Sequence, residues 1–405
     1  MTSHESLWRT IRMRIFSLAC VIAAFGLCLA PAGAFAQDTP SPTWAWSADG
    51  NLFVGYNYQL RKFTDIDAWE SQNWLMGSGE RLLGSGRLIV STMISLEPFT
   101  MPKEGSPELF QTGESYQRIP LVNFQHPHDL VMELGATYRF VKPRITYIFG
   151  ADVVGPATLG PPVFMHRESA RNNPQVPITH HFMDSTHVSN GVVRGGVDTH
   201  GFTIEASAFR GEEPDENRLN IERPTLDSWA ARIGYRRGPW SAQFSGGRLK
   251  TPEWFEPYDE TRLTASIGYN GTIGSKRLDA TLAWGENRED IVINGVSDGY
   301  LLEWNLQATP RLALYGRSEI ALKELFGLGL HPFGFQHPHI YSHFDTLTLG
   351  LVRDFVTHRW ARIGVGGDVT LYHMSPDMLQ YYEGSRSFHA FVRWRPNSTE
   401  GSHIH

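Results

Sequence analysis

Several stretches of about ten residues alternate strictly between apolar and polar side chains, as membrane-spanning strands do. In residues 129–140, Met132 and Leu134 share one face, and Glu133 lies on the opposite face. The same pattern recurs in two later segments, residues 277–285 and 299–308. A period of two predicts β-strands. The length of the segments favours a membrane barrel, because strands of soluble sandwiches are usually about five or six residues long.

Sixteen strands are predicted, and single-chain bacterial barrels have even strand numbers. They span residues 46–58, 72–80, 86–97, 128–140, 144–152, 186–197, 201–210, 227–237, 239–249, 261–270, 276–287, 298–308, 311–321, 345–355, 359–373 and 386–395. Short turns alternate with long connections. The long connections are expected at about 98–127, 153–185, 211–226, 250–260, 288–297, 322–344 and 374–385.

All of the long connections fall at the same end of the predicted barrel. Outer-membrane barrels have short periplasmic turns and long extracellular loops. We therefore predict an all-β fold, a transmembrane antiparallel β-barrel of about sixteen strands in the outer membrane of a Gram-negative cell.

The N-terminus has the three parts of a secretory signal peptide. A basic stretch with Arg9, Arg12 and Arg14 precedes an apolar run at 15–30, and Ala-Phe-Ala follows at 34–36. Both cysteines, Cys20 and Cys28, lie in this segment, so the mature chain lacks thiol ligands and disulfides. The expected organisation is a signal peptide at 1–36, a periplasmic lead at 37–45, the barrel at 46–395 and a periplasmic tail at 396–405.

The composition restricts the partners of the chain. Charged residues make up 19% of it and the formal net charge is −6. Nucleic-acid binding would need a basic surface, so we expect none. The expected partners are outer-membrane lipid, the barrel assembly machinery, and small solutes or metal ions, with the barrel a monomer or a homotrimer.

Charges of both signs fall on the predicted inner face, and barrels of sixteen strands are wide enough for an aqueous channel. The predicted pore-lining residues are Glu133, Arg139, Asp152, Glu205, Arg232, Arg262, Asp279, Glu303, Arg317, Glu319 and Arg393. This arrangement favours a porin-like channel for small hydrophilic solutes or ions.

The pentapeptide FQHPH occurs twice, at 124–128 and at 335–339, and both copies are expected at the extracellular mouth. Imidazole is a common ligand of copper and zinc. The candidate metal ligands are His126, His128, Asp129, His166, His180, His181, His187, His337, His339 and His343. The alternative is structural: each His-Pro-His forms a turn whose rings pack on neighbouring aromatic residues.

Two other segments have residue types found at functional sites. The acidic segment 211–218 could bind a cation, although a solvated loop also explains it. Asp184, Ser185 and His187 are the residue types of a serine hydrolase. No orienting partner or oxyanion hole is evident for them, so we expect no enzyme. An outer-membrane lipolytic enzyme is the weakest of the alternatives.

Several phrases resemble those of an uncharacterised bacterial outer-membrane β-barrel family associated with copper-handling gene neighbourhoods. They are SLEPFTMP at 95–102, QHPHDL at 125–130, LGPPVFMHR at 159–167, DSTHVSNGVV at 184–193 and GEEPDENR at 211–218. The resemblance implies a copper context and assigns no role to any residue. It supports, beside the channel, the alternative of a barrel that binds or transports copper or zinc with its histidine-rich extracellular loops.

Overall fold

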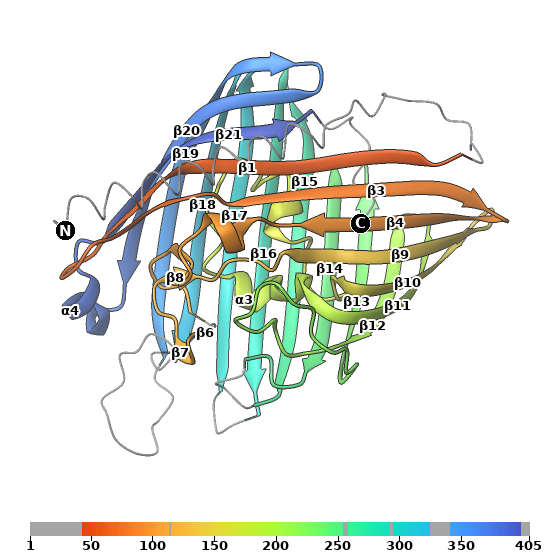
Figure 1. Cartoon of the computed structure of the whole chain (residues 1–405), viewed down its shortest axis with the longest axis horizontal. Coiled ribbons are helices and arrows are strands. Elements are labelled where there is room, and N and C mark those ends of the chain that lie inside the picture. The colour runs from red at the N-terminus through yellow and green to blue at the C-terminus, as the bar shows by residue number, and fades with distance from the viewer. Residues whose placement is uncertain (1–42, 113–114, 254–257, 291–294, 325–340, 398–405) are drawn as a thin grey trace, which may run out of the picture.

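A computed structural model describes residues 43–112, 115–253, 258–290, 295–324 and 341–397. The predicted signal peptide and the second FQHPH copy lie outside the described residues. The described chain forms a closed antiparallel β-barrel of sixteen strands, as predicted (Figure 1). The last strand pairs with the first, from Leu52 opposite Trp394 to Leu60 opposite Arg386, and so closes the barrel.

Each predicted strand overlaps an observed one. The strands are β1 (Ala45–Leu60), β3 (Asn73–Leu83), β4 (Gly86–Ile94), β9 (Val131–Val141), β10 (Thr146–Gly155), β11 (Ser189–Thr199), β12 (Phe202–Phe209), β13 (Ser228–Arg237), β14 (Trp240–Leu249), β15 (Glu260–Ile273), β16 (Lys276–Glu289), β17 (Val296–Thr309), β18 (Leu312–Glu324), β19 (Tyr341–His358), β20 (Ala361–Met374) and β21 (Arg386–Pro396). The short strand β2 (Ile66–Glu70) pairs with the part of β1 that β3 leaves free.

The outer face of the barrel is apolar. Leu282 and Leu302 are paired on neighbouring strands and are 54% and 48% exposed, whereas Glu303 is 1% exposed. An apolar band of this kind is stable only against lipid. Aromatic pairs lie near the short turns, with ring centroids 4.4 Å apart for Phe202 and Tyr235. They match the aromatic girdles at the edges of membrane barrels.

One predicted face is wrong. Met132 was expected to face outward with Leu134, but it is fully buried inside the barrel. The pairing of β4 with β9 shifts between Met93 and Ile94. This β-bulge adds one residue to β9, and an extra residue reverses the alternation that follows from a period of two.

Two of the long connections fold back into the barrel instead of standing above it. The first, residues 95–130, contains the short helix α2 (Glu97–Thr100) and the short strands β5 (Ser106–Pro107), β6 (Ser115–Tyr116), β7 (Ile119–Pro120) and β8 (Phe124–Gln125). The second, residues 156–188, is almost entirely buried. It contains η1 (Phe164–His166), α3 (His180–Met183) and η2 (Ser185–His187). We call residues 156–188 the inserted segment.

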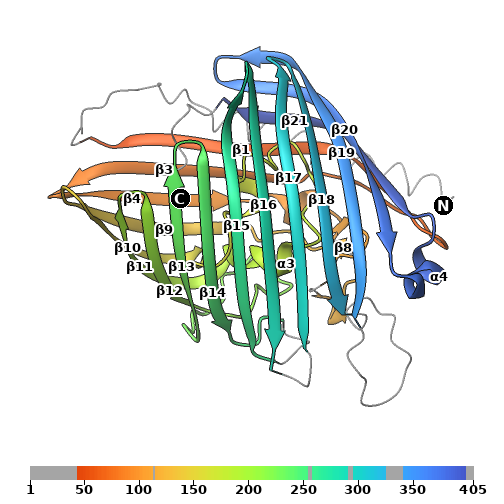
Figure 2. The same cartoon turned by 180° about the vertical axis from the view of Figure 1, so that it is seen from behind.

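The inserted segment packs on the inner wall at β15, β16 and β17, which lie in front of α3 when the barrel is seen from behind (Figure 2). Gly285 and Gly299 are paired on β16 and β17 and make room for it. A Cβ atom at Gly285 would lie 2.1 Å from the Phe182 carbonyl oxygen. The absence of these side chains lets the helix approach the wall.

The connection between β20 and β21 contains η3 (Pro376–Met378) and α4 (Leu379–Tyr382). No helix in the described ranges is long and apolar enough to cross a membrane.

Candidate functional site

The inner wall carries the charged residues that the sequence predicts there, and five of them hold residues 167–185 of the inserted segment. Arg262 donates to the Ser185 hydroxyl (2.7 Å), and Arg317 donates to the Gln175 carbonyl (2.7 Å). Glu319 accepts from the Thr179 hydroxyl (2.7 Å). Arg393 donates to the side-chain oxygen of Asn172, and Glu303 pairs with Arg167. These side chains therefore face the segment that crosses the lumen.

The other predicted pore-lining residues are partnered mainly along the wall. Arg139 lies 3.4 Å from Asp198, and Asp279 lies 3.0 Å from Arg277. Glu205 and Arg232 pair with each other at 3.1 Å. Asp152 pairs with Arg194, and Glu133 accepts a hydrogen bond from Ser91. That any of the eleven residues lines a conducting pore stays a prediction.

The strongest attachment of the inserted segment is a buried ionic network centred on Arg167. Its guanidinium lies 2.5 Å from Glu303 on β17 and also contacts Asp184 of the inserted segment. Arg317 lies 3.2 Å from the second oxygen of Glu303. Burial alone would lower the pKa of Arg167, but the carboxylates of Glu303 and Asp184 outweigh it and raise this pKa. The Arg167 guanidinium therefore stays charged over the whole physiological range.

Five of the predicted metal ligands come together inside the barrel as a histidine row. The ring centroids of His126 and His128 are 6.2 Å apart, and those of His128 and His187 are 5.3 Å apart. The row continues from His187 to His180 at 5.2 Å and from His180 to His181 at 5.4 Å. The first FQHPH copy thus meets the THHFMDSTH segment, and both are buried.

Acceptors orient the imidazoles of this row through Nδ1. His128 Nδ1 lies 2.7 Å from the Glu97 carboxylate, and His180 Nδ1 lies 2.6 Å from the Asp184 carboxylate. His187 Nδ1 lies 2.9 Å from the Asp184 carbonyl oxygen. The Nε2 atoms of His128 and His187 are buried, and neither has a hydrogen-bond partner among the described residues. Metal-binding histidines are held in this way, with one nitrogen oriented and the other available.

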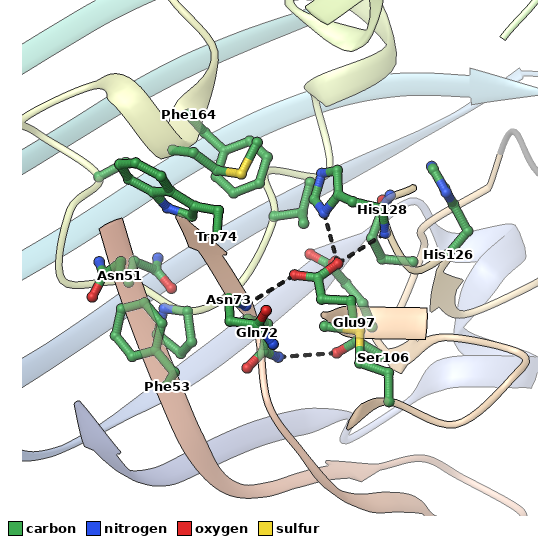
Figure 3. A pocket seen from close by; sticks show the side chains of 18 of the residues that line it. Asn51, Phe53, Gln72, Asn73, Trp74, Glu97, Ser106, His126, His128 and Phe164 are labelled. Carbon is green, nitrogen blue, oxygen red and sulfur yellow. Dashed lines mark hydrogen bonds and ion pairs between the residues drawn. The ribbon is translucent and has the colours of Figure 1, made fainter. Parts of the chain in front are cut away.

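Local sequence explains the position of Glu97. It opens the helix α2, and Pro98 occupies the first turn, where a proline is tolerated. The Glu97 carboxylate accepts from the backbone amides of Asn73 (3.2 Å) and His128 (2.9 Å), and from the His128 ring (Figure 3). A cavity of about 30 Å³ lies beside these groups and is lined also by Trp74 and Phe164. It is large enough for about two water molecules.

Burial keeps parts of the row uncharged. It lowers the pKa of His126 and of His187 well below the ordinary value, and neighbouring histidines add to the effect. Burial alone would raise the pKa of Asp184, but Arg167 and His180 hold that pKa well below its usual range. Neutral imidazole is the form that binds metal.

The remaining predicted ligands lie elsewhere. Asp129 lies 3.4 Å from Arg218, and the ring of His166 packs on Trp74 with centroids 4.9 Å apart. His343 is exposed on β19, which begins at Tyr341 instead of the predicted residue 345. His337 and His339 lie outside the described residues.

The segment with the residue types of a serine hydrolase has other contacts. The Asp184 carboxylate binds His180 and Arg167, while the Nδ1 atom of His187 lies 2.9 Å from the backbone carbonyl oxygen of Asp184. The Ser185 hydroxyl accepts from Arg262. These contacts hold the segment to the wall.

Sequence reasoning missed Glu97 and the orienting role of Asp184. The role of Asp184 could have been found, because it follows His180 by four residues, a spacing that brings two side chains together on a helix. Glu97 is 31 residues from His128, and no pattern in the sequence connects them.

The fold is that of the bacterial porins. No family model and no curated protein matches the chain. Among solved structures, an anion-selective porin from Comamonas acidovorans matches with a TM-score of 0.51 and 13% identity, over 87% of this chain and 100% of that one. OmpF from Salmonella typhi, solved in complex with daunomycin, matches with a TM-score of 0.54 and 9% identity, over 86% and 97% of the two chains. The protein therefore has the β-barrel fold of the outer-membrane porins.

Proposed function

We propose that the protein is an outer-membrane channel for small hydrophilic solutes or ions, narrowed by the inserted segment. The apolar outer face fits lipid, and the inner face carries charges of both signs. The observation that carries the proposal is the crossing of the lumen by residues 156–188, fixed by Arg167 to Glu303 on the opposite wall. Such a crossing sets the width of the passage and places charged groups along it.

Single-channel conductance in planar bilayers tests this proposal. The refolded parent protein should give small conductance steps. Arg167→Ala removes the guanidinium that joins Glu303 to Asp184, and breaking such a buried pair costs about 3–5 kcal/mol. The inserted segment should then leave the wall, and the steps should become larger.

Arg248→Ala is the matched control. Arg248 also holds two carboxylates, Asp259 and Asp290, but it lies at the end of β14, and its partners are half-buried or exposed. The conductance of the Arg248→Ala variant should equal that of the parent protein. Absence of conductance steps in all three proteins would refute the channel.

We also propose, as a second candidate function, that the histidine row binds copper or zinc. The row offers imidazole without thiolate, a ligand set that suits Cu(II) or Zn(II). The supporting observation is that His128 and His187 each present a buried Nε2 without a hydrogen-bond partner among the described residues. The copper context implied by the resemblance finds no counterpart in the matched proteins.

Titration of the metal-free protein with Cu(II) and with Zn(II) tests the second candidate. His128→Ala/His187→Ala should lose the high-affinity binding that the parent shows. His343→Ala/His373→Ala removes two exposed histidines and should retain it. Equal affinity of the two double variants would exclude the row as the binding site.

A further inference from the structure

Three long connections meet around His181 at the end of the histidine row. His181 belongs to the inserted segment, Glu213 to the connection after β12, and Glu253 to the connection after β14. His181 Nδ1 lies 3.3 Å from the Glu253 carboxylate and 3.8 Å from the Glu213 carboxylate. One ligand atom from each residue lies within 4.8 Å of the other two. Glu213 belongs to the acidic segment 211–218, for which the sequence left cation binding open, whereas Glu253 was not expected as a ligand.

Hydrogen bonding of the His181 ring does not explain this cluster. Neither ring nitrogen makes a hydrogen bond with acceptable geometry in the described part of the chain, although the residue is only 8% exposed. A buried imidazole thus faces two carboxylates without a hydrogen bond to either.

The three groups are held in place before any ion binds. The backbone amide of Glu213 donates to the Pro252 carbonyl (3.0 Å), which joins the two connections that carry the glutamates. Asn287 on β16 donates to the His181 carbonyl (3.2 Å) and fixes α3 to the wall. The side chains of Glu213 and Glu253 are only 9% and 14% exposed. A preorganised site of this kind loses little entropy on binding.

We propose that His181, Glu213 and Glu253 form a binding site for a divalent transition-metal ion. One imidazole and two carboxylates combine a borderline ligand with hard oxygen ligands, a set that suits Zn(II) or Mn(II). Water would supply the remaining ligands. The bound ion would join the inserted segment to two outer connections and so hold it in the lumen. Only this last effect rests on the proposed channel function; the binding itself does not.

The test is calorimetric titration of EDTA-treated protein, refolded from inclusion bodies so that no lipopolysaccharide is present, with Zn(II) and with Mn(II). Glu213→Gln/Glu253→Gln keeps the size of both side chains and removes both charges. This variant should lose one equivalent of binding or weaken its affinity by at least about tenfold, because even partners outside the ligand shell change affinity by that much. His181→Gln should have the same effect.

Glu212→Gln/Asp259→Asn is the matched control, because it removes two carboxylates from the same two connections, where they pair with Arg210 and Arg248. It should bind as the parent does. Retention of a folded barrel is checked by the heat-modifiable mobility of each variant on a gel. If the parent binds neither ion, or if Glu213→Gln/Glu253→Gln binds both ions unchanged, the site does not exist.

Discussion

At the scale of single residues, the alternation of outward and inward side chains determines what each position tolerates. Leu302 faces lipid, whereas Glu303, the next residue, is buried in the interior. The sequence predicts both, because a strand with one face in lipid cannot slip by one residue without exposing charge to lipid. Met132 could not be predicted, because a bulge adds a residue without any signal in the composition.

Leu302→Arg should destabilise the folded barrel by about 2–4 kcal/mol, the cost of arginine at a lipid-facing position near the midplane. The measurement is urea unfolding in vesicles, followed by the heat-modifiable band. Gln243→Arg places the same side chain on the inner face of β14, where Gln243 is half-buried and donates to Thr264. Equal losses for the two variants would contradict the assignment of faces.

At the scale of elements, the inserted segment is the part whose position the sequence could not predict. Strand positions follow from local periodicity, but the direction in which a long connection folds depends on contacts distant in the sequence. Arg167 and Glu303 are 136 residues apart. The sequence therefore could not predict that five of the histidines are buried together. The orienting contact of Glu97 could not be anticipated for the same reason.

Gly285→Ala should displace α3 without disturbing the barrel. The added methyl group would lie 2.1 Å from the Phe182 carbonyl oxygen, which belongs to backbone and cannot rotate away. We expect larger conductance steps and a heat-modifiable band equal to that of the parent. Gly195→Ala is the control, because the nearest atom to its added carbon is the Ile148 carbonyl oxygen at 3.9 Å. A conductance change of the same size in both variants would argue against steric displacement of the helix.

Acidification should release the inserted segment and the connection at 95–130 from the wall. His126 and His187 have a lowered pKa in the docked state, whereas in a solvated loop they would titrate near about 6.5. The docked state thus binds fewer protons, and docking is favoured above this pH and weakened as the pH falls below it. Conductance should rise as the pH falls through about 6.5. His126→Gln/His187→Gln cannot gain these protons, and its conductance should depend less on pH; an unchanged pH profile would exclude these two histidines.

At the scale of the whole molecule, the two ends of the barrel differ in the length of their connections. The segment that contains Asp215 belongs to the long end, and the turn at Thr199 and His200 belongs to the short end. The sequence predicts this asymmetry completely, because turn residues and strand lengths are both local features. The sequence cannot predict that the inserted segment crosses the lumen, because its partners on the far wall are brought near only when the barrel is closed.

An epitope inserted after Asp215 should be labelled on intact cells, because long connections of outer-membrane barrels are extracellular. An epitope inserted after His200 should be labelled only after permeabilisation. Antibody labelling followed by flow cytometry measures both. Labelling of the His200 insertion on intact cells would mean that the barrel has the opposite orientation.

The attachment of the inserted segment also has a consequence for the order of assembly. The segment lies between β10 and β11, but its partners include Glu303 on β17 and Arg393 on β21, the latter 221 residues after Asn172. Contacts between residues so distant in the chain form late, because the intervening chain must first be ordered. Narrowing of the lumen must therefore follow insertion and closure of the wall. For the proposed channel, we therefore expect each newly inserted molecule to pass through a wider, leakier stage, and the membrane to be more permeable during synthesis of the protein than after synthesis stops.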